Sequence, residues 1–402
     1  MSSKNRLARL RSILFCLAFS ALTGCGGGSG SNSGGRTPTV LRQGVVQLPI
    51  DNSVLVSGLT DSAMTITGNV PAIQAGNTLV NTTGHGFIRK VVSVTPTAGG
   101  VTVQTTNGNL TDVFEQTDYT LAKSLQSADF ESVTATYPGV TVSQNRSTRD
   151  SGLTLSYDFK KMPLSGPADN PTVYIDGNMT LAVHLDIDLQ IRHFSVQKFR
   201  CVEGLSGSVT ANLKVAVTDL DIKKDIQIGE IRGAPIPGPL GIPLVPTILV
   251  YLRASGSVST GLVFSPSATV TTSAGVEYDA GAGWQNIASL DKTFTLPDMP
   301  NVYASFKADI CPVCTEFGLE IAGIAGPTIH VDMPYGEVEF TAQANPPSVE
   351  AFGRIGVKAS AGVHAEIFGF SADYSTPALI DQKIDVFHRV FNADGSINLG
   401  IN

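Results

Sequence analysis

The sequence predicts an all-β protein, with a small N-terminal β domain followed by a large, long-stranded antiparallel β-sandwich or curved sheet. Apolar residues recur at every second position, most clearly over residues 173–191 and again over 209–217, 268–278 and 355–367. This period places apolar side chains on one face of a strand and polar side chains on the other, as is typical of antiparallel sheets. The charged fraction of 15% excludes a disordered chain, which needs high charge and low hydrophobicity.

Residues 1–24 are predicted to be a lipoprotein signal peptide. Four basic residues and no acidic one precede the apolar stretch Ile13–Leu22, which is too short for a stable membrane span. The tetrad Leu22-Thr23-Gly24-Cys25 resembles the bacterial lipobox of signal peptidase II substrates. The resemblance implies a thioether-linked diacylglycerol on Cys25, cleavage before it, and acylation of the new N-terminus, for example with palmitate. The alternative is an ordinary signal peptide with a chance cysteine.

Residues 25–39 are rich in glycine and serine, and we expect a flexible tether there. Gly26 follows the cysteine where an aspartate would favour the inner membrane. The resemblance to Gram-negative lipoproteins therefore implies lipid anchoring in the bacterial cell envelope, at the outer membrane. Without its signal peptide the chain has 23 basic and 34 acidic residues, a net charge of about −11. This charge excludes nucleic acid as a partner and repels anionic lipids. Attachment to the membrane must therefore come from the acyl anchor.

Residues 40–125 are predicted to form the small β domain. Strands are expected near residues 43–48, 62–67, 77–81, 86–94 and 100–106, with a short helical turn at 109–114. The domain resembles a module of uncharacterised bacterial surface proteins in the segments Gly76–Val80, Gly86–Val94, Thr105–Thr106 and Leu110–Phe114. The resemblance covers only this region. It implies an extracytoplasmic setting and assigns no activity.

Residues 126–402 are predicted to form the large antiparallel β domain. Hairpin turns are expected at Asp279–Gly283 and at Lys223–Lys224. One segment departs from the period of two, because residues 379–391 carry apolar residues at helical spacing after Thr376-Pro377. A helix is therefore expected there, with a strand as the alternative.

Three cysteines follow Cys25, namely Cys201, Cys311 and Cys314. Because export leads to an oxidising compartment, we expect one structural disulfide, between Cys201 and either Cys311 or Cys314. A thioredoxin-like redox pair at Cys311 and Cys314 is one alternative, but it would need a strand followed by a helix, whereas the flanking residues favour strands. A zinc site is another alternative, and it would need further ligands nearby.

Other polar groups give weaker signals. The polar face of the strand predicted at 173–191 carries His184, Asp186 and Asp188. A solvated sheet surface is the favoured interpretation, because neighbours on one strand face lie about 6.6 Å apart and a cation would need ligands from another strand. His85 is expected at an exposed turn. The sequence contains no serine-hydrolase Gly-x-Ser-x-Gly, no HExxH zinc motif, no P-loop and no dinucleotide-binding glycine fingerprint. It therefore predicts neither an enzyme nor a bound cofactor or metal.

The most unusual segment is 234–246, which contains five prolines and no charge. Proline lacks the backbone donor that a central strand requires. We therefore expect an edge or crossover segment that packs on the core. The alternative is an exposed apolar loop that contacts lipid or a partner.

Together these features predict a lipid-anchored β protein of the cell envelope with a structural, adhesive or assembly role. The alternative is a carrier that holds a lipid or another hydrophobic ligand on the apolar face of a curved sheet, where small side chains at 355–365 leave room. The expected partners are the membrane, through the acyl anchor, and either a protein or a lipid.

Overall fold

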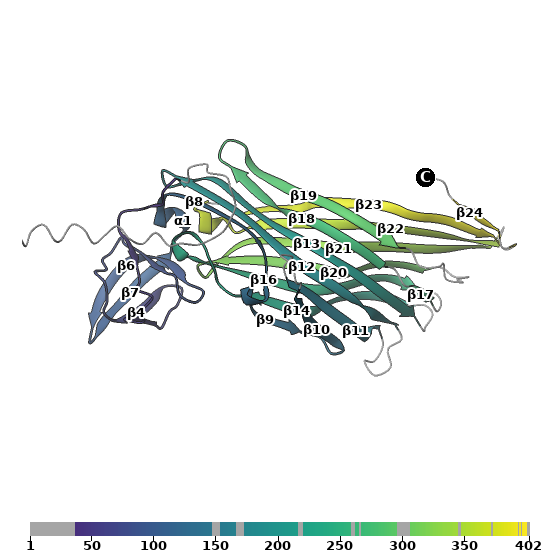
Figure 1. The fold of residues 1–402 in the computed structure, drawn as a ribbon, viewed down its shortest axis with the longest axis horizontal. Coiled ribbons are helices and arrows are strands. Elements are labelled where there is room, and N and C mark those ends of the chain that lie inside the picture. The colour runs from purple at the N-terminus through teal and green to yellow at the C-terminus, as the bar shows by residue number, and fades with distance from the viewer. Residues whose placement is uncertain are drawn as a thin grey trace, which may run out of the picture. The chain divides into compact units, whose positions relative to one another are not determined.

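The structure, a computed structural model, describes residues 37–146, 153–165, 173–215, 220–258, 262–264, 267–295, 306–344, 347–370, 373–392, 394 and 396–399. The predicted signal peptide, Cys25 and the tether up to residue 36 therefore lie outside the described residues. Residues 37–402 form one compact unit. Its described part consists almost entirely of strands in three sheets, which confirms the predicted all-β fold (Figure 1).

The first large sheet contains nine antiparallel strands in the described residues. They are β1 (Val40–Leu41), β8 (Phe114–Ser124), β10 (Val140–Arg146), β11 (Leu153–Ser165), β12 (Val173–Arg192), β13 (Ser195–Val215), β17 (Leu262–Phe264), β18 (Ser267–Asp279) and β19 (Gly283–Thr295). β12 and β13 form a long hairpin that pairs from Val173 opposite Val215 to Arg192 opposite Ser195. β11 pairs with the first half of β12 and β8 with its second half, while β18 and β19 extend the other side.

The second large sheet also contains nine strands in the part of the chain that the structure describes. They are β9 (Phe130–Ala135), β14 (Leu220–Gly233), β15 (Ile236–Pro237), β16 (Pro243–Val258), β20 (Phe306–Ile321), β21 (Ile324–Ala344), β22 (Pro347–Val363), β23 (Tyr374–Asn392) and β24 (Ile397–Leu399). The order runs from β24 through β23, β22, β21, β20, β16 and β14 to β9. The chain therefore passes repeatedly from one large sheet to the other.

The third sheet has six strands and corresponds to the predicted small domain. They are β2 (Val45–Gln47), β3 (Val54–Ser57), β4 (Ala63–Gly68), β5 (Thr78–Asn81), β6 (Phe87–Thr97) and β7 (Gly100–Asn107). All five expected strands are present, and β3 is an addition. β2 and β5 pair in parallel. β8, which the sequence analysis placed in this domain, instead pairs with β12 of the first large sheet.

Helical structure is confined to short turns in the described residues. They are α1 (Leu110–Val113), η1 (Ser127–Asp129), η2 (Pro239–Gly241) and η3 (Ala365–Phe368). The predicted turn at 109–114 is α1. Its N-terminus is capped because Asn109 Oδ1 accepts from the Asp112 amide at 2.9 Å and Asp112 Oδ2 accepts from the Asn109 amide at 3.2 Å. Within the described part of the chain, no helix has the length and apolar character needed to cross a membrane.

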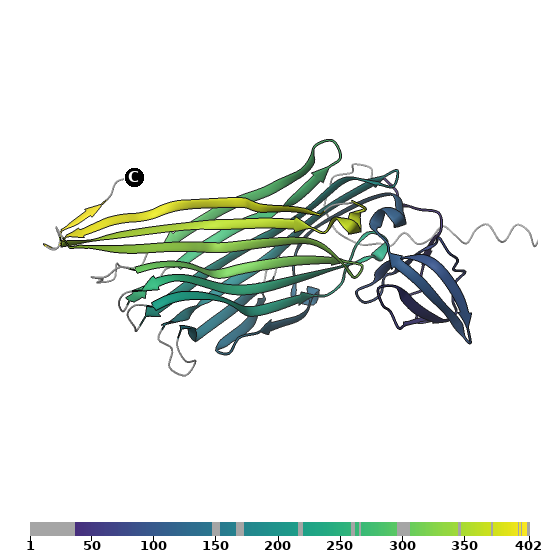
Figure 2. The same ribbon diagram turned by 180° about the vertical axis from the view of Figure 1, so that it is seen from behind.

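The two large sheets face each other and share one apolar core (Figure 2). The inward side chains of β12 lie in phase with the predicted period, and none of them is more than 4% exposed: Ile175, Met179, Leu181, Val183, Leu185, Ile187, Leu189 and Ile191. Each such side chain contributes about 1.5–3 kcal/mol through burial. The six-stranded sheet has a second core of its own, around Met64, Ile66 and Val103.

Side chains hold the two large sheets together along both edges. On one edge, Trp284 of β19 stacks on Tyr374 of β23 with ring centroids 5.1 Å apart, and the Tyr374 hydroxyl donates to Asn286 Oδ1 at 2.9 Å. On the other edge, buried Tyr157 of β11 packs against Gly229 of β14. A Cβ at Gly229 would lie 2.5 Å from the Tyr157 ring, so glycine is needed there.

Two local predictions are wrong. Residues 379–391 are part of strand β23, because that segment pairs with β22 from Tyr374 to Asn392 and this ladder outweighs the helical spacing of its apolar residues. Pro377 lies where the register slips, a position at which proline costs no ladder bond. Lys223 and Lys224 lie inside β14 and not at a turn. The expected turn at Asp279–Gly283 does join β18 to β19.

The proline-rich segment packs on the core, as the favoured interpretation expected. Ile236, Ile242 and Leu244 are at most 5% exposed. The expectation of an edge or crossover segment is wrong for Pro243–Pro246, because these residues open β16, which lies between β14 and β20. Proline is accommodated there because the pairing of β14 with β16 stops at Arg232 opposite Thr247, one residue after Pro246. The Pro246 ring instead lies against Gly233.

Candidate functional site

The polar face of β12 is an ion-paired sheet surface. Asp186 Oδ2 lies 2.7 Å from Arg200 Nη1, and Asp188 Oδ2 lies 3.5 Å from Lys198 Nζ. His184 Nδ1 forms a 3.0 Å hydrogen bond with a serine hydroxyl of β8. Basic side chains of β13 therefore neutralise Asp186 and Asp188, the carboxylates that would have bound a metal ion. This supports the interpretation of this face as a solvated sheet surface.

The expected disulfide of Cys201 is wrong. Cys311 is bonded to Cys314, with 5.9 Å between their Cα atoms, and Cys201 is free and buried. Cys201 belongs to the core between the sheets. Cys311 lies opposite Arg253, and Cys314 lies opposite Asp332, so both point to the outer face of the second large sheet. The second sheet thus separates Cys201 from the other two sulphurs.

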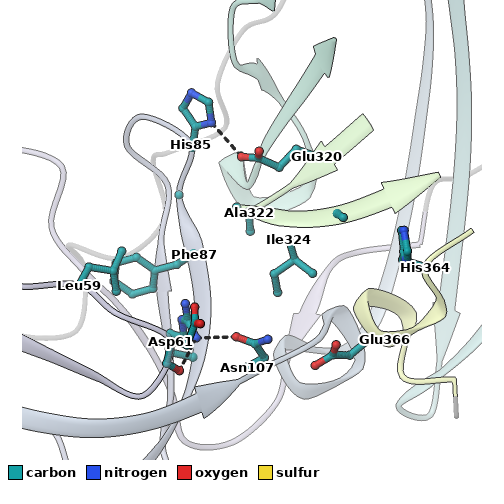
Figure 3. A pocket seen from close by; sticks show the side chains of 14 residues that line it. Leu59, Asp61, His85, Phe87, Asn107, Glu320, Ala322, Ile324, His364 and Glu366 are labelled. Carbon is teal, nitrogen blue, oxygen red and sulfur yellow. Dashed lines mark hydrogen bonds and ion pairs between the residues drawn. The ribbon is translucent and has the colours of Figure 1, made fainter. Parts of the chain in front are cut away.

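A polar pocket of about 540 Å³ lies where the six-stranded sheet meets the turn between β20 and β21 (Figure 3). His85, which is exposed at a turn as predicted, forms a 2.8 Å hydrogen bond with Glu320 through its Nδ1 atom. Arg89 donates to the Asp61 carbonyl at 2.9 Å on the opposite wall. The labelled side chains of Figure 3 include acids and histidines from both parts of the unit.

Two side chains of this pocket, those of His85 and Glu320, pair with each other in contact with water. The side chains of His85 and Glu320 are 55% and 36% exposed, and an exposed pair of this kind contributes about 0–1 kcal/mol. Gly86 approaches Pro243 so closely that a Cβ would lie 2.6 Å from the proline ring. The pocket is therefore best explained as the contact between the small sheet and the large ones.

A different polar group lies inside the core. Glu203 of β13 stands opposite Leu185 of β12 and Ala274 of β18, both of which belong to the apolar core. Residues directly opposite each other in an antiparallel ladder share a face, so Glu203 points between the two large sheets. Its exposed fraction is 0%.

Glu203 has no polar partner among the residues that the structure describes. Both carboxyl oxygens lack a hydrogen bond within the part of the chain that the structure describes. Burial disfavours the charged form and raises the pKa of Glu203 to about 8, so the carboxyl is protonated at neutral pH. A buried acid without a partner costs about 1–3 kcal/mol relative to one that is hydrogen-bonded.

Small side chains occur on β18, which is the neighbour of β13, and on β22, which faces β18. β13 faces β20, and β18 faces β21 and β22 of the other sheet. Ala274 on β18 and Ala359 and Ala361 on β22 are buried in this core. A protonated carboxyl group can both donate and accept a hydrogen bond. The arrangement can therefore bind the polar group of a molecule whose remaining surface is apolar.

Glu203 was not among the site residues predicted from the sequence, although the sequence contains a signal for it. The apolar positions of β13 include Cys201, Leu205 and Val209, and Glu203 occupies the same alternation. A charged residue at an inward position of an amphipathic strand is the pattern that identifies a buried acid. Cys25, the expected lipidation site, lies outside the described residues.

Comparison with known proteins gives no further guidance to this site. No family model matches the chain, and no curated protein or solved structure shows significant similarity to it.

Proposed function

We propose that this chain is a lipid-anchored protein of the bacterial cell envelope that binds a long-chain amphiphile between its two large sheets. The lipobox at Leu22–Cys25 supports the anchor. The unpartnered carboxyl group of Glu203 in the apolar core supports the binding function. A purely structural or adhesive β-sandwich needs no buried acid, and the acid lowers its stability.

The ligand has an apolar chain and a polar group that forms hydrogen bonds with Glu203. The core between the sheets supplies the apolar surface. It is formed by side-chain packing between two sheets that share no hydrogen-bonded ladder in the described residues. Because the side chains around Glu203 are buried, the ligand enters when the sheets separate locally. Binding then replaces contacts within the core by contacts with the ligand and gives Glu203 its missing partner.

Direct binding measurements with residues 37–402, which form one compact unit, test this function. We expect a fluorescent probe with a long alkyl chain and an amine or hydroxyl group to bind the native chain. Glu203→Met should lower the affinity for this probe about tenfold, which is the effect of losing one hydrogen bond to an ionisable group. A probe with the same alkyl chain and no polar group should bind both proteins alike.

The matched control is Glu339→Met, because the Glu339 side chain is 42% exposed and pairs with Lys307. This variant should bind both probes as the native chain does. If neither probe binds the native chain and no lipid co-purifies with it, a structural, adhesive or assembly role replaces the carrier function.

Lipidation of Cys25 has a separate test in the full chain. The native protein is expected to fractionate with membranes and to carry a diacylglycerol mass on its N-terminal peptide, because two or three acyl chains give stable anchoring. Cys25→Ser should leave an uncleaved precursor or release the chain from the membrane. Correct cleavage with unchanged membrane fractionation in this variant would contradict the lipobox assignment.

A further inference from the structure

The segment from Cys311 to Cys314 forms a bulge in a central strand. In a regular strand, residues three apart point to opposite faces, with Cα atoms about 10 Å apart. Here Cys311 pairs with Arg253 of β16 and Cys314 pairs with Tyr251. The two cysteines are three residues apart on β20, but their partners are only two residues apart on β16, so β20 has one extra residue. The extra residue turns both cysteines to the outer face and brings their Cα atoms to 5.9 Å.

A carboxyl group of the next strand completes a cluster at this bulge. Cys314 lies opposite Asp332 of β21, and the two sulphurs and one Asp332 oxygen lie within 4.8 Å of one another. Cys311 is 3% exposed and Cys314 is 0% exposed, so the sulphurs are shielded from water. In a tetrahedral zinc site with bonds of about 2.3 Å, ligand atoms stand roughly 3.8 Å apart, so only small movements separate this cluster from such a site.

The disulfide itself explains little of this arrangement. In the chain-entropy account, the stabilisation by a disulfide grows with the length of the loop that it closes, and this bond joins residues only three apart in the sequence. The bulge also interrupts the regular register of two neighbouring strands. Stabilisation through restraint of the unfolded chain therefore does not account for the cluster.

We propose that Cys311, Cys314 and Asp332 form a binding site for a thiophilic divalent metal ion of the zinc class, which opens when the disulfide is reduced. A dithiol reductant transfers two electrons and two protons to the disulfide and is itself oxidised to a disulfide. The two cysteine thiols then bind the ion as thiolates and release two protons to water. Asp332 supplies the third ligand, and water occupies the fourth position.

Arg253 orients the carboxylate of this site. Its Nη1 donates to Asp332 Oδ1 at 2.8 Å, which leaves the second carboxylate oxygen for the metal ion. Two thiolates and one carboxylate carry three negative charges, of which a divalent ion neutralises two. Arg253, which also pairs with Asp225, places positive charge beside the site. Lys358, which lies opposite Asp332, places further positive charge there. Hydrogen bonding of a ligating carboxylate by a neighbouring side chain is a common feature of metal sites and orients the ligand.

Zinc stoichiometry of the full chain, purified in detergent, tests the site. A phosphine reductant is applied without denaturant and then removed in the absence of oxygen. It becomes a phosphine oxide with the oxygen of water, whose two hydrogens go to the sulphurs. We expect the reduced chain to bind one additional Zn²⁺ relative to the oxidised chain. Co²⁺ in its place should give a thiolate-to-cobalt charge-transfer band in the near ultraviolet.

Two aspartates provide matched variants, because both pair with Arg253. Asp332→Asn removes a ligand and should weaken zinc binding about tenfold or more, whereas Asp225→Asn should leave it unchanged. Cys311→Ser should abolish the additional zinc while the buried thiol of Cys201 remains. The proposal is overturned if the native disulfide resists the phosphine, if reduction adds no zinc, or if both aspartate variants bind zinc like the native chain.

Discussion

Replacing Leu244 with aspartate should lower the free energy of unfolding by about 4 kcal/mol or more. Leu244 is 3% exposed and lies in the core between the large sheets, at the start of β16. The change removes an apolar side chain, which costs about 2–5 kcal/mol, and leaves an ionisable group among apolar neighbours. Neighbouring Ile236 and Ile321, which lie opposite it on both sides, would lose their contacts.

Urea denaturation followed by circular dichroism measures this effect. Leu55→Asp is the control, because Leu55 of β3 is 60% exposed and its replacement should change stability by no more than about 0.5 kcal/mol. If the Leu244→Asp chain has the denaturation midpoint of the native chain, the proline-rich segment is not packed as described. Its apolar side chains would then form a contact surface for lipid or a partner.

Replacing Glu203 with methionine should have the opposite effect and raise stability by a few kcal/mol at pH 8. Methionine has a similar length and packs in an apolar site without a desolvated carboxyl group. Because the pKa of Glu203 in the folded chain is raised to about 8 from an ordinary value of 4.5, the folded state keeps a proton that the unfolded state releases. Stability of the native chain should therefore fall between about pH 4.5 and pH 8 and level off above.

Thermal or urea unfolding at several pH values separates this contribution from those of other groups. The Glu203→Met chain should lose less stability over that interval than the native chain, and the gain should be largest at the upper end. Glu339→Met, at a partly exposed position, should follow the native pH profile. A Glu203→Met chain that is less stable than the native one at pH 8 would show that Glu203 has a compensating partner.

The period of two predicted the strands well because it reflects burial, which is local information. It located β12 almost to the residue and most strands of the small sheet. It did not locate the pairing of β8, because the partner strand β12 lies far along the chain. The prediction of a helix at 379–391 was wrong for a related reason, because pairing with the neighbouring strand β22 determines the conformation of this segment.

The sites were harder to predict than the strands. Glu203 could have been found, because its position in the alternation is visible in the sequence. The pairing of Cys311 with Cys314 was only an alternative at the sequence level, because regular strand geometry places residues three apart on opposite faces and the bulge depends on the register of β16 and β21. Distances between sheets decide which cysteines meet, and these arise only when the whole core is assembled.

The stacked pair at the edge of the two large sheets has a spectroscopic consequence. Trp284 is the only tryptophan of the chain, and it joins β19 of one sheet to Tyr374 on β23 of the other. Phe370 and Tyr278 also contact its ring, with centroids 5.8 Å and 5.2 Å away. Because Tyr374 belongs to the other sheet, the intrinsic fluorescence of Trp284 should change when the two layers separate at this edge. Time-resolved emission can follow that opening without any attached label.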